Sequence, residues 1–255
     1  MKSPSEEDSS YFDFPLGNSS ARTRENVTQG IPDDEVTFSG KRQSYCVCYI
    51  DMINSTTITA GMSEFDIGKY YSIFLNSMAV IAKNFGAKII KNAGDSLIFY
   101  FPRSLDSVNI LVFKDILECF LTMSLAHDAI NAKLSKEDLP AMNYRISADF
   151  GQLEVAWSTT ANSSDFFGST MNVCAKINSK AMPNGIVIGS GLYEKIKNHF
   201  NNDAYKFEEI GTYPSGAKEN YPIYSVTSKE KRIMLNPFAR TASQNPQDIA
   251  IDDNS

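Results

Sequence analysis

The sequence predicts an α+β fold in one compact domain. Strand-like and helix-like segments follow one another in the order strand, helix, strand, strand, helix, strand. Residues typical of a hairpin turn join the second and third strands. The chain has 255 residues, of which 42% are hydrophobic and 21% charged, and these values are ordinary for a globular domain with a substantial core.

The first strand and the first helix are expected between residues 45 and 86. The run YCVCYID (45–51) is aromatic and β-branched with a charge only at its end, which is typical of a buried strand that ends at Asp51. The Ser63-x-x-Asp66 pattern predicts a helix N-terminus, and Gly86 predicts the end of that helix. Apolar residues recur between them at helical spacing: Ile67, Tyr70, Tyr71, Phe74, Met78, Ile81 and Phe85.

A hairpin and a second long helix are expected next. The strand patterns AKIIK and SLIFYF flank turn residues at 92–95, and helical periodicity then predicts one helix over roughly 107–133. After a break at Pro140, NYRISADF and QLEVAW are expected to form a strand pair on either side of Gly151. A short helix is expected from about Ser169 to Lys180.

This order of elements is the ferredoxin-like βαββαβ arrangement, with additional strands and helices after it. A right-handed crossover leaves room for the third strand beside the first, and the two strands run antiparallel. The end of the first strand, at Asp51, should therefore lie next to the start of the third strand, at Asp95.

One domain with two tails is expected. Residues 1–43 and 228–255 are rich in polar residues and predict flexible tails around a domain at 44–227. The N-terminus has no apolar stretch behind its lysine, so no secretory signal is predicted and a cytoplasmic location is the default expectation. The apolar runs are too short to span a bilayer, so no membrane span is expected.

Charge and residue counts argue against several kinds of site. With 24 Lys and Arg against 30 Asp and Glu, the formal charge is −6 and no wide basic stripe is present, which argues against a nucleic-acid partner. The four cysteines support neither a zinc site nor a disulfide framework. His127 and His199 lie in helix-like segments far from any Ser-Asp constellation, which argues against a histidine-dependent triad.

The expected pairing of Asp51 with Asp95 indicates a metal site. Two carboxylates on neighbouring strands repel each other unless cations lie between them, and such oxygen ligands suit Mg²⁺ or Mn²⁺ bound together with substrate phosphates. Taken singly, Asp51 could cap the turn before a helix and Asp95 could be an ordinary hairpin-turn residue. The predicted topology, which brings the two together, favours the metal site.

Four runs of the sequence resemble a known family. They are CYIDMINST, KIIKNAGDSLIFYF, RISADFGQLEVA and DFFGSTMNVCAKI. In this order and spacing they resemble the catalytic domain of class III adenylate and guanylate cyclases, over roughly residues 44–227. The resemblance implies the class III nucleotidyl cyclase fold, which contains the ferredoxin-like core predicted above.

The resemblance also implies a two-metal site. Asp51 and Asp95 match the family's metal-binding aspartates, which hold two Mg²⁺ or Mn²⁺ ions per site, and the Met52 carbonyl is a further expected ligand. Backbone N–H groups of the following residues are expected to face the substrate phosphates: Ile53, Asn54, Ser55 and Thr56. Asn54 and Ser55 stand where the family usually has Gly-Phe.

Further residues match the nucleotide-binding positions of the family. Lys91 and Asp165 match the base-selecting pair, and an ammonium with a carboxylate complements the N1 acceptor and N6 amine of adenine, so ATP is expected rather than GTP. Asn172 matches the residue that orients the ribose. Lys176 occupies the place of an arginine that stabilises the pentavalent phosphate, and lysine lacks arginine's planar fork. Lys218 is a further candidate for gripping the terminal phosphates, displaced from the family position.

The resemblance implies an adenylate cyclase that converts ATP to 3′,5′-cyclic AMP and pyrophosphate. In the family, one subunit supplies the metal aspartates and the other supplies the remaining site residues, so a homodimer with two shared sites is implied. The alternative, suggested by Lys176, is a weakly active or non-catalytic cyclase-like module that binds nucleotides or regulates a partner. A polymerase-palm-like or diguanylate cyclase enzyme would share the two-aspartate geometry, but the hairpin has no Gly-Gly-Asp/Glu-Glu-Phe run.

Overall fold

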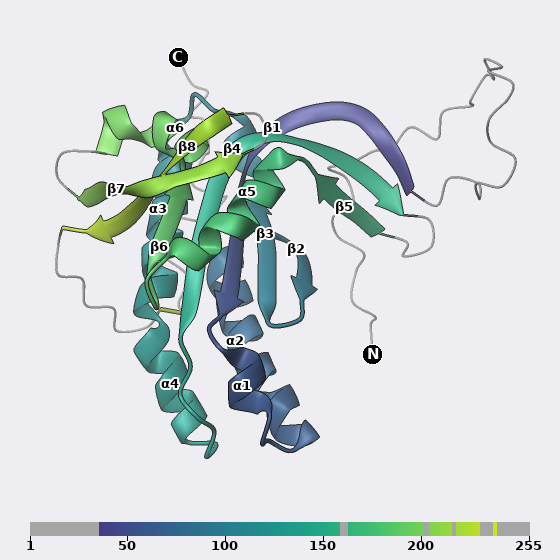
Figure 1. The fold of residues 1–255 in the computed structure, drawn as a ribbon, viewed down its shortest axis with the longest axis vertical. Coiled ribbons are helices and arrows are strands. Elements are labelled where there is room, and N and C mark those ends of the chain that lie inside the picture. Colours follow the sequence, from purple (N-terminus) through teal and green to yellow (C-terminus); the bar gives the residue numbers. More distant parts are fainter. Residues whose placement is uncertain (1–35, 159–162, 201–203, 216–217, 230–236, 239–255) are drawn as a thin grey trace, which may run out of the picture.

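The computed structural model describes residues 36–158, 163–200, 204–215, 218–229 and 237–238. The strands are β1 Val36–Met52, β2 Lys88–Ala93, β3 Ser96–Phe101, β4 Tyr144–Ser158, β5 Ser163–Phe167, β6 Ile186–Gly189, β7 Tyr205–Ser215 and β8 Lys218–Ser228. The helices are α1 Ser55–Thr59, α2 Glu64–Asn84, α3 Ile110–Leu125, α4 His127–Ser135, α5 Ser169–Ile177 and α6 Ser190–Phe200, with 3₁₀ turns η1 Pro102–Leu105 and η2 Asn178–Lys180. The predicted α+β class is confirmed (Figure 1).

All described strands belong to one mixed sheet. Its order is β2-β3-β1-β4-β6-β8-β7, and β5 pairs with β4 beside this path. β1 is antiparallel to both β3 and β4, whereas β4 and β6 are parallel. The series β1-α2-β2-β3-α3-β4 therefore has the predicted ferredoxin-like order, and the β2–β3 hairpin turns where the sequence predicts.

Side chains of β1 alternate between two faces of the sheet. One face carries the main core, in which Cys46, Cys48 and Ile50 pack with apolar residues of α2, α3, α4 and α6. The other face carries smaller clusters, one around Tyr45 and Val47 and one formed by α5 with β6 and β8. Because Asp51 is in phase with Tyr45 and Val47, it lies on the face that carries α5.

Parts of both predicted tails have defined structure. β1 begins at Val36, so residues 36–43 belong to a strand, which forms a projecting arm with β5 and the far part of β4 (Figure 1). Beyond β8, the Phe238 side chain packs against the main core, and its carbonyl accepts a hydrogen bond from Asn84 Nδ2 at 3.0 Å. The rest of the two predicted tails, 1–35, 230–236 and 239–255, lies outside the described residues.

Two predicted elements are wrong in detail. The helix expected over 107–133 is divided at the buried Ala126 into α3 and α4. The two strands expected on either side of Gly151 are one continuous strand, β4. Close packing, and not a turn, requires glycine there, because a Cβ on Gly151 would lie 2.5 Å from Thr170 Oγ1 of α5.

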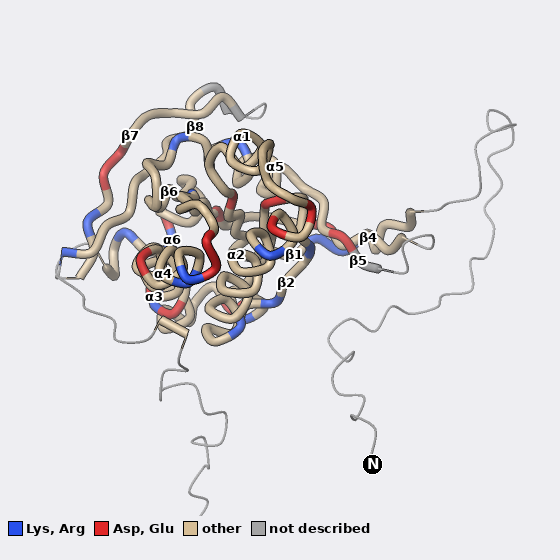
Figure 2. Tube along the Cα trace, turned by 90° about the horizontal axis from the view of Figure 1, so that it is seen from below, with Lys and Arg blue, Asp and Glu red and all other residues tan. Residues whose placement is uncertain are grey.

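The charged residues are spread over the described elements. Lys and Arg are interspersed with Asp and Glu along the chain trace (Figure 2). None of the described helices has the length and apolar character needed to cross a lipid bilayer.

Candidate active site

Asp51 and Asp95 meet where β1 ends and β3 begins, as the topology predicts. Asp51 is paired in register with Ser96, the residue that follows Asp95. The Ser96 hydroxyl donates to Asp51 Oδ1 and accepts a hydrogen bond from the Tyr49 hydroxyl at 2.8 Å. The Ser55 hydroxyl donates to Asp95 Oδ2. Each carboxylate is therefore oriented by one serine hydroxyl.

The surroundings of Asp51 oppose its ionisation. Burial raises the pKa of the Asp51 carboxyl, and the negative charge of Asp95 raises it further. The hydrogen bond from Ser96 and the positive charge of Arg145 act in the opposite direction. Arg145 lies opposite Asp51 on β4, and its Nε donates to the Ala181 carbonyl at 3.0 Å.

The two aspartates are a suitable donor set for a hard divalent cation. In the described part of the chain, no lysine, arginine or histidine forms an ion pair with Asp51 or Asp95. The same residues contain no group of three or more His, Cys, Asp or Glu that could hold a metal ion. Further ligands would have to be backbone, water or phosphate oxygens, which is the usual pattern for Mg²⁺.

The loop after Asp51 leaves the sheet within three residues. Met52 has a buried side chain in the last β1 position, and the Ile53 N–H donates to the Asn143 carbonyl at 2.8 Å. Asn54 has a left-handed backbone (φ 56°), and α1 starts at Ser55. The Ile53 N–H is engaged by the Asn143 carbonyl, directly before β4, and its contact with a phosphate stays a prediction. The amides of Asn54, Ser55 and Thr56 stay predicted phosphate contacts, as the Met52 carbonyl stays a predicted metal ligand.

Lys91 and Asp165 lie together, although they come from separate parts of the sheet. Lys91 Nζ of β2 is 2.5 Å from Asp165 Oδ2 of β5. The other carboxylate oxygen of Asp165 accepts the Phe166 N–H at 2.8 Å. Both side chains are partly exposed, so the ammonium and the carboxylate are accessible to a ligand while each orients the other.

Asn172 and Lys176 line a cleft of about 740 Å³ beside α5. The two residues are one helical turn apart and exposed, so they share a face of the helix. Lys176 Nζ lies 5.7 Å from the centre of the Tyr213 ring, which is also part of the cleft wall. An aromatic face at this distance attracts the ammonium and restricts the flexible side chain.

Several known proteins share this fold. The adenylyl cyclase CyaB of P. aeruginosa superposes with a TM-score of 0.64 at 17% identity, covering 76% of this chain and 98% of that structure. The guanylyl cyclase Cya2 superposes with a TM-score of 0.63 at 20% identity, covering 73% of this chain and 93% of that structure. The fold is that of a class III nucleotidyl cyclase catalytic domain.

Sequence comparison finds low similarity to an adenylate cyclase. An adenylate cyclase of Streptomyces coelicolor is 21% identical over 170 residues, which are 67% of this chain. The aligned part spans only 38% of that protein's length. No family model matches the sequence.

The sequence analysis did not identify a buried carboxylate at the same cleft. Asp149 of β4 is 2% exposed and accepts hydrogen bonds from the Tyr221 hydroxyl at 2.7 Å and the Leu192 N–H at 3.2 Å. Burial raises its pKa to about 6, although these hydrogen bonds act against the shift. Gly189 and Gly191 permit its position, because a Cβ on either would lie under 3.0 Å from its carboxyl. Asp149 therefore joins β4, α6 and β8 at the wall of the cleft.

The residues that match cyclase site positions form three separate groups. They are Asp51 with Asp95, Lys91 with Asp165, and Asn172 with Lys176; among the described residues no hydrogen bond or ion pair joins one group to another. The cleft that contains Asn172 and Lys176 is lined by neither metal-type aspartate. The backbone of Lys218 begins β8, but its side chain lies outside the described part of the chain.

Proposed function

We propose that this chain is an adenylate cyclase that converts ATP to 3′,5′-cyclic AMP and pyrophosphate. The observation that carries the proposal is the Asp51–Asp95 pair, which lies at the end of β1 in a cyclase fold. Neither aspartate has a basic ion-pair partner among the described residues. The Lys91–Asp165 pair supports the choice of ATP, because its donor and acceptor complement the adenine edge.

The chain's residues have distinct proposed roles. Asp51 and Asp95 hold two Mg²⁺ or Mn²⁺ ions, which would supply Lewis acidity at the ribose hydroxyl and the phosphates. Lys91 and Asp165 orient the base, and Asn172 orients the ribose. The Lys176 ammonium, held beside Tyr213, offers positive charge to the α-phosphate as negative charge develops there.

The proposed site is completed by a second copy of the chain. The cleft with Asn172 and Lys176 is lined by neither metal-type aspartate, and the proposed site needs both. In a symmetric dimer the aspartates of one subunit face the cleft of the other, and two equivalent sites result.

A direct assay tests the proposal. Purified protein with Mg²⁺ or Mn²⁺ should release cyclic AMP and pyrophosphate in equal amounts from ATP, and the Asp95→Asn variant should release neither. Predominant cyclic GMP formation from GTP would overturn the choice of base. No cyclic nucleotide from either substrate would favour the nucleotide-binding module.

The base preference has its own test at Lys91. Replacing Lys91 by Glu puts an acceptor opposite adenine N1, so ATP turnover should fall much more than GTP turnover. The ratio of kcat/KM for the two substrates measures this effect. An equal loss for both nucleotides would show that Lys91 has only a structural role.

A further inference from the structure

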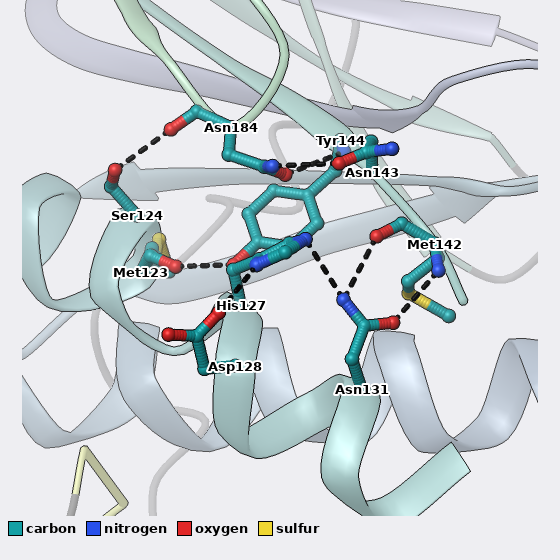
Figure 3. Close-up of polar contacts among 9 residues, drawn as sticks. All are labelled: Met123, Ser124, His127, Asp128, Asn131, Met142, Asn143, Tyr144 and Asn184. Carbon is teal, nitrogen blue, oxygen red and sulfur yellow. Dashed lines mark hydrogen bonds and ion pairs between the residues drawn. The ribbon is translucent and has the colours of Figure 1, made fainter. Parts of the chain in front are cut away.

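The segment Met142–Tyr144, which leads into β4, is held by an asparagine of α4. Asn131 accepts the Met142 N–H at 2.8 Å and donates through Nδ2 to the Met142 carbonyl at 3.1 Å (Figure 3). Its Nδ2 also lies 2.8 Å from His127 Nε2, and His127 Nδ1 lies 2.9 Å from Asp128 Oδ1. The Asn131 amide can satisfy all these contacts in one orientation, because its two amide hydrogens serve Met142 and His127 while its oxygen accepts.

A second asparagine holds the same segment from the opposite side. Asn184, in the turn before β6, donates through Nδ2 to Asn143 Oδ1 at 2.7 Å and accepts the Tyr144 N–H at 3.2 Å. Its own N–H donates to the Tyr144 carbonyl at 2.7 Å, and its carbonyl accepts the Ser124 hydroxyl at 2.7 Å (Figure 3). Its left-handed backbone (φ 59°) is a conformation that asparagine tolerates better than most residues.

The segment Met142–Tyr144 is hydrogen-bonded to the start of the loop that follows Asp51, which is the candidate phosphate-binding loop. Met52 pairs with Tyr144, and the Ile53 N–H donates to the Asn143 carbonyl at 2.8 Å. This hydrogen bond is the last between β1 and the β4 side before Asn54 turns into the left-handed region and α1 begins. A shift of Asn143 would therefore move the point at which the chain leaves the sheet, and with it the backbone N–H groups from Asn54 onward.

We propose that Asn131 and Asn184 are positioning residues for the candidate nucleotide site. By clamping Met142–Tyr144 from α4 and from the β6 turn, they fix the hydrogen bond between Asn143 and Ile53 and thereby the loop that follows Asp51. Neither asparagine is among the residues proposed to bind the nucleotide. The effect on nucleotide affinity rests on the proposed function, whereas the effect on the loop does not.

Hydrogen exchange at the Ile53 amide, followed by NMR, tests the structural part. Asn184→Gly preserves the left-handed backbone and removes both side-chain contacts to Asn143 and Tyr144, so exchange at Ile53 should become about five- to tenfold faster. Ser124→Ala is the matched control, because it removes a hydrogen bond to Asn184 without touching Met142–Tyr144, and it should leave that rate unchanged. Asn184→Asp, which keeps the acceptor for the Tyr144 N–H, should give a smaller increase and serves if the glycine variant does not fold.

Steady-state kinetics test the link to nucleotide binding. A displaced loop weakens contacts that substrate and transition state share, so Asn184→Gly should raise the KM for ATP about five- to tenfold with a smaller change in kcat. Unchanged exchange at Ile53 in a folded Asn184 variant would overturn the clamp. Faster exchange with an unchanged KM would overturn its link to the site. If the wild-type chain makes no cyclic nucleotide, the proposed function fails, and the exchange measurement still decides the clamp.

Discussion

At Asp51, activity and stability have opposite requirements. Burial and the charge of Asp95 raise the pKa of the Asp51 carboxyl, so the ionised form that the proposed metal site requires is the form that the fold disfavours. The hydroxyl of Ser96 and the guanidinium of Arg145 offset part of this cost. The proposed metal site and the stability of the fold therefore favour opposite protonation states of this carboxyl.

Asp51→Asn is expected to abolish cyclase activity and raise the free energy of unfolding at pH 7 by about 0.5–1 kcal/mol. The amide keeps the shape of the carboxylate and an acceptor for Ser96, while it removes the repulsion from Asp95. Urea unfolding and the cyclase assay measure the two effects. Glu209→Gln makes the same chemical change at an exposed position of β7 and should alter neither quantity. A less stable Asp51→Asn protein would contradict the argument.

The buried carboxyl of Asp149 should make the free energy of unfolding depend on pH. Its pKa of about 6 in the folded chain lies above the value of about 3.9 expected in the unfolded chain. The folded state therefore binds the proton more tightly, and the stability that this carboxyl contributes at low pH is lost as the pH rises from about 4 to about 6. Relative to Asp149→Asn, the wild type should lose on the order of 2 kcal/mol over this window. Urea unfolding of both proteins at pH 4, 5, 6 and 7 measures the difference, and parallel curves would show that folding does not raise the pKa of Asp149.

At the scale of elements, local sequence patterns predicted the helices and turns whose formation depends on neighbouring residues in the chain. The helical spacing and capping box gave α2, and the turn residues gave the β2–β3 hairpin, so the meeting of Asp51 and Asp95 followed from topology. The division of α3 from α4 at Ala126 could not be predicted, because no glycine or proline marks it. Ala126 is buried and keeps a right-handed helical backbone where α3 ends and α4 begins.

The site residues that escaped prediction depend on pairing between distant strands. Arg145 lies opposite Asp51 only because of the β1–β4 register, and Asp149 meets Tyr221 through β6 and β8. Ser96 and Tyr49 carried a local signal, since Ser96 follows Asp95 and Tyr49 points to the same face as Asp51 two residues away. That signal becomes specific only when the strands are known to be neighbours.

The lysine at position 176 of α5 should limit the catalytic rate. An arginine can place two N–H donors on the oxygens of the transition state, whereas lysine offers one ammonium, so Lys176→Arg should raise kcat with little change in KM. Lys176→Ala should lower kcat on the order of 10²–10³-fold, because a preorganised charge is lost. Rates at saturating ATP and metal ion compare the three proteins. A rate in Lys176→Ala equal to that of the wild type would remove this residue from the site.

At the scale of the whole molecule, the separation of the metal-type aspartates from the cleft predicts complementation. Asp51→Ala and Asp165→Ala proteins should each be inactive alone. An equal mixture that exchanges subunits freely should recover about a quarter of the wild-type activity, because half of the dimers are mixed and each mixed dimer has one intact site of two. The recovered cyclase rate is the measurement. No recovery in a mixture proven to exchange subunits would contradict the shared site.

The β1–β4 pairing also determines how long a new chain stays vulnerable during synthesis. β1 is central in the sheet, yet β3 and β4, which cover its two edges, are both made later, and about a hundred residues separate the end of β1 from the end of β4. At roughly 5–20 residues per second, the ribosome needs about 5–20 s to supply them. During that time the apolar run YCVCYI has a free edge, which is a template for aggregation. Chaperone capacity during this interval, more than the final stability of the domain, should therefore limit the yield of folded protein.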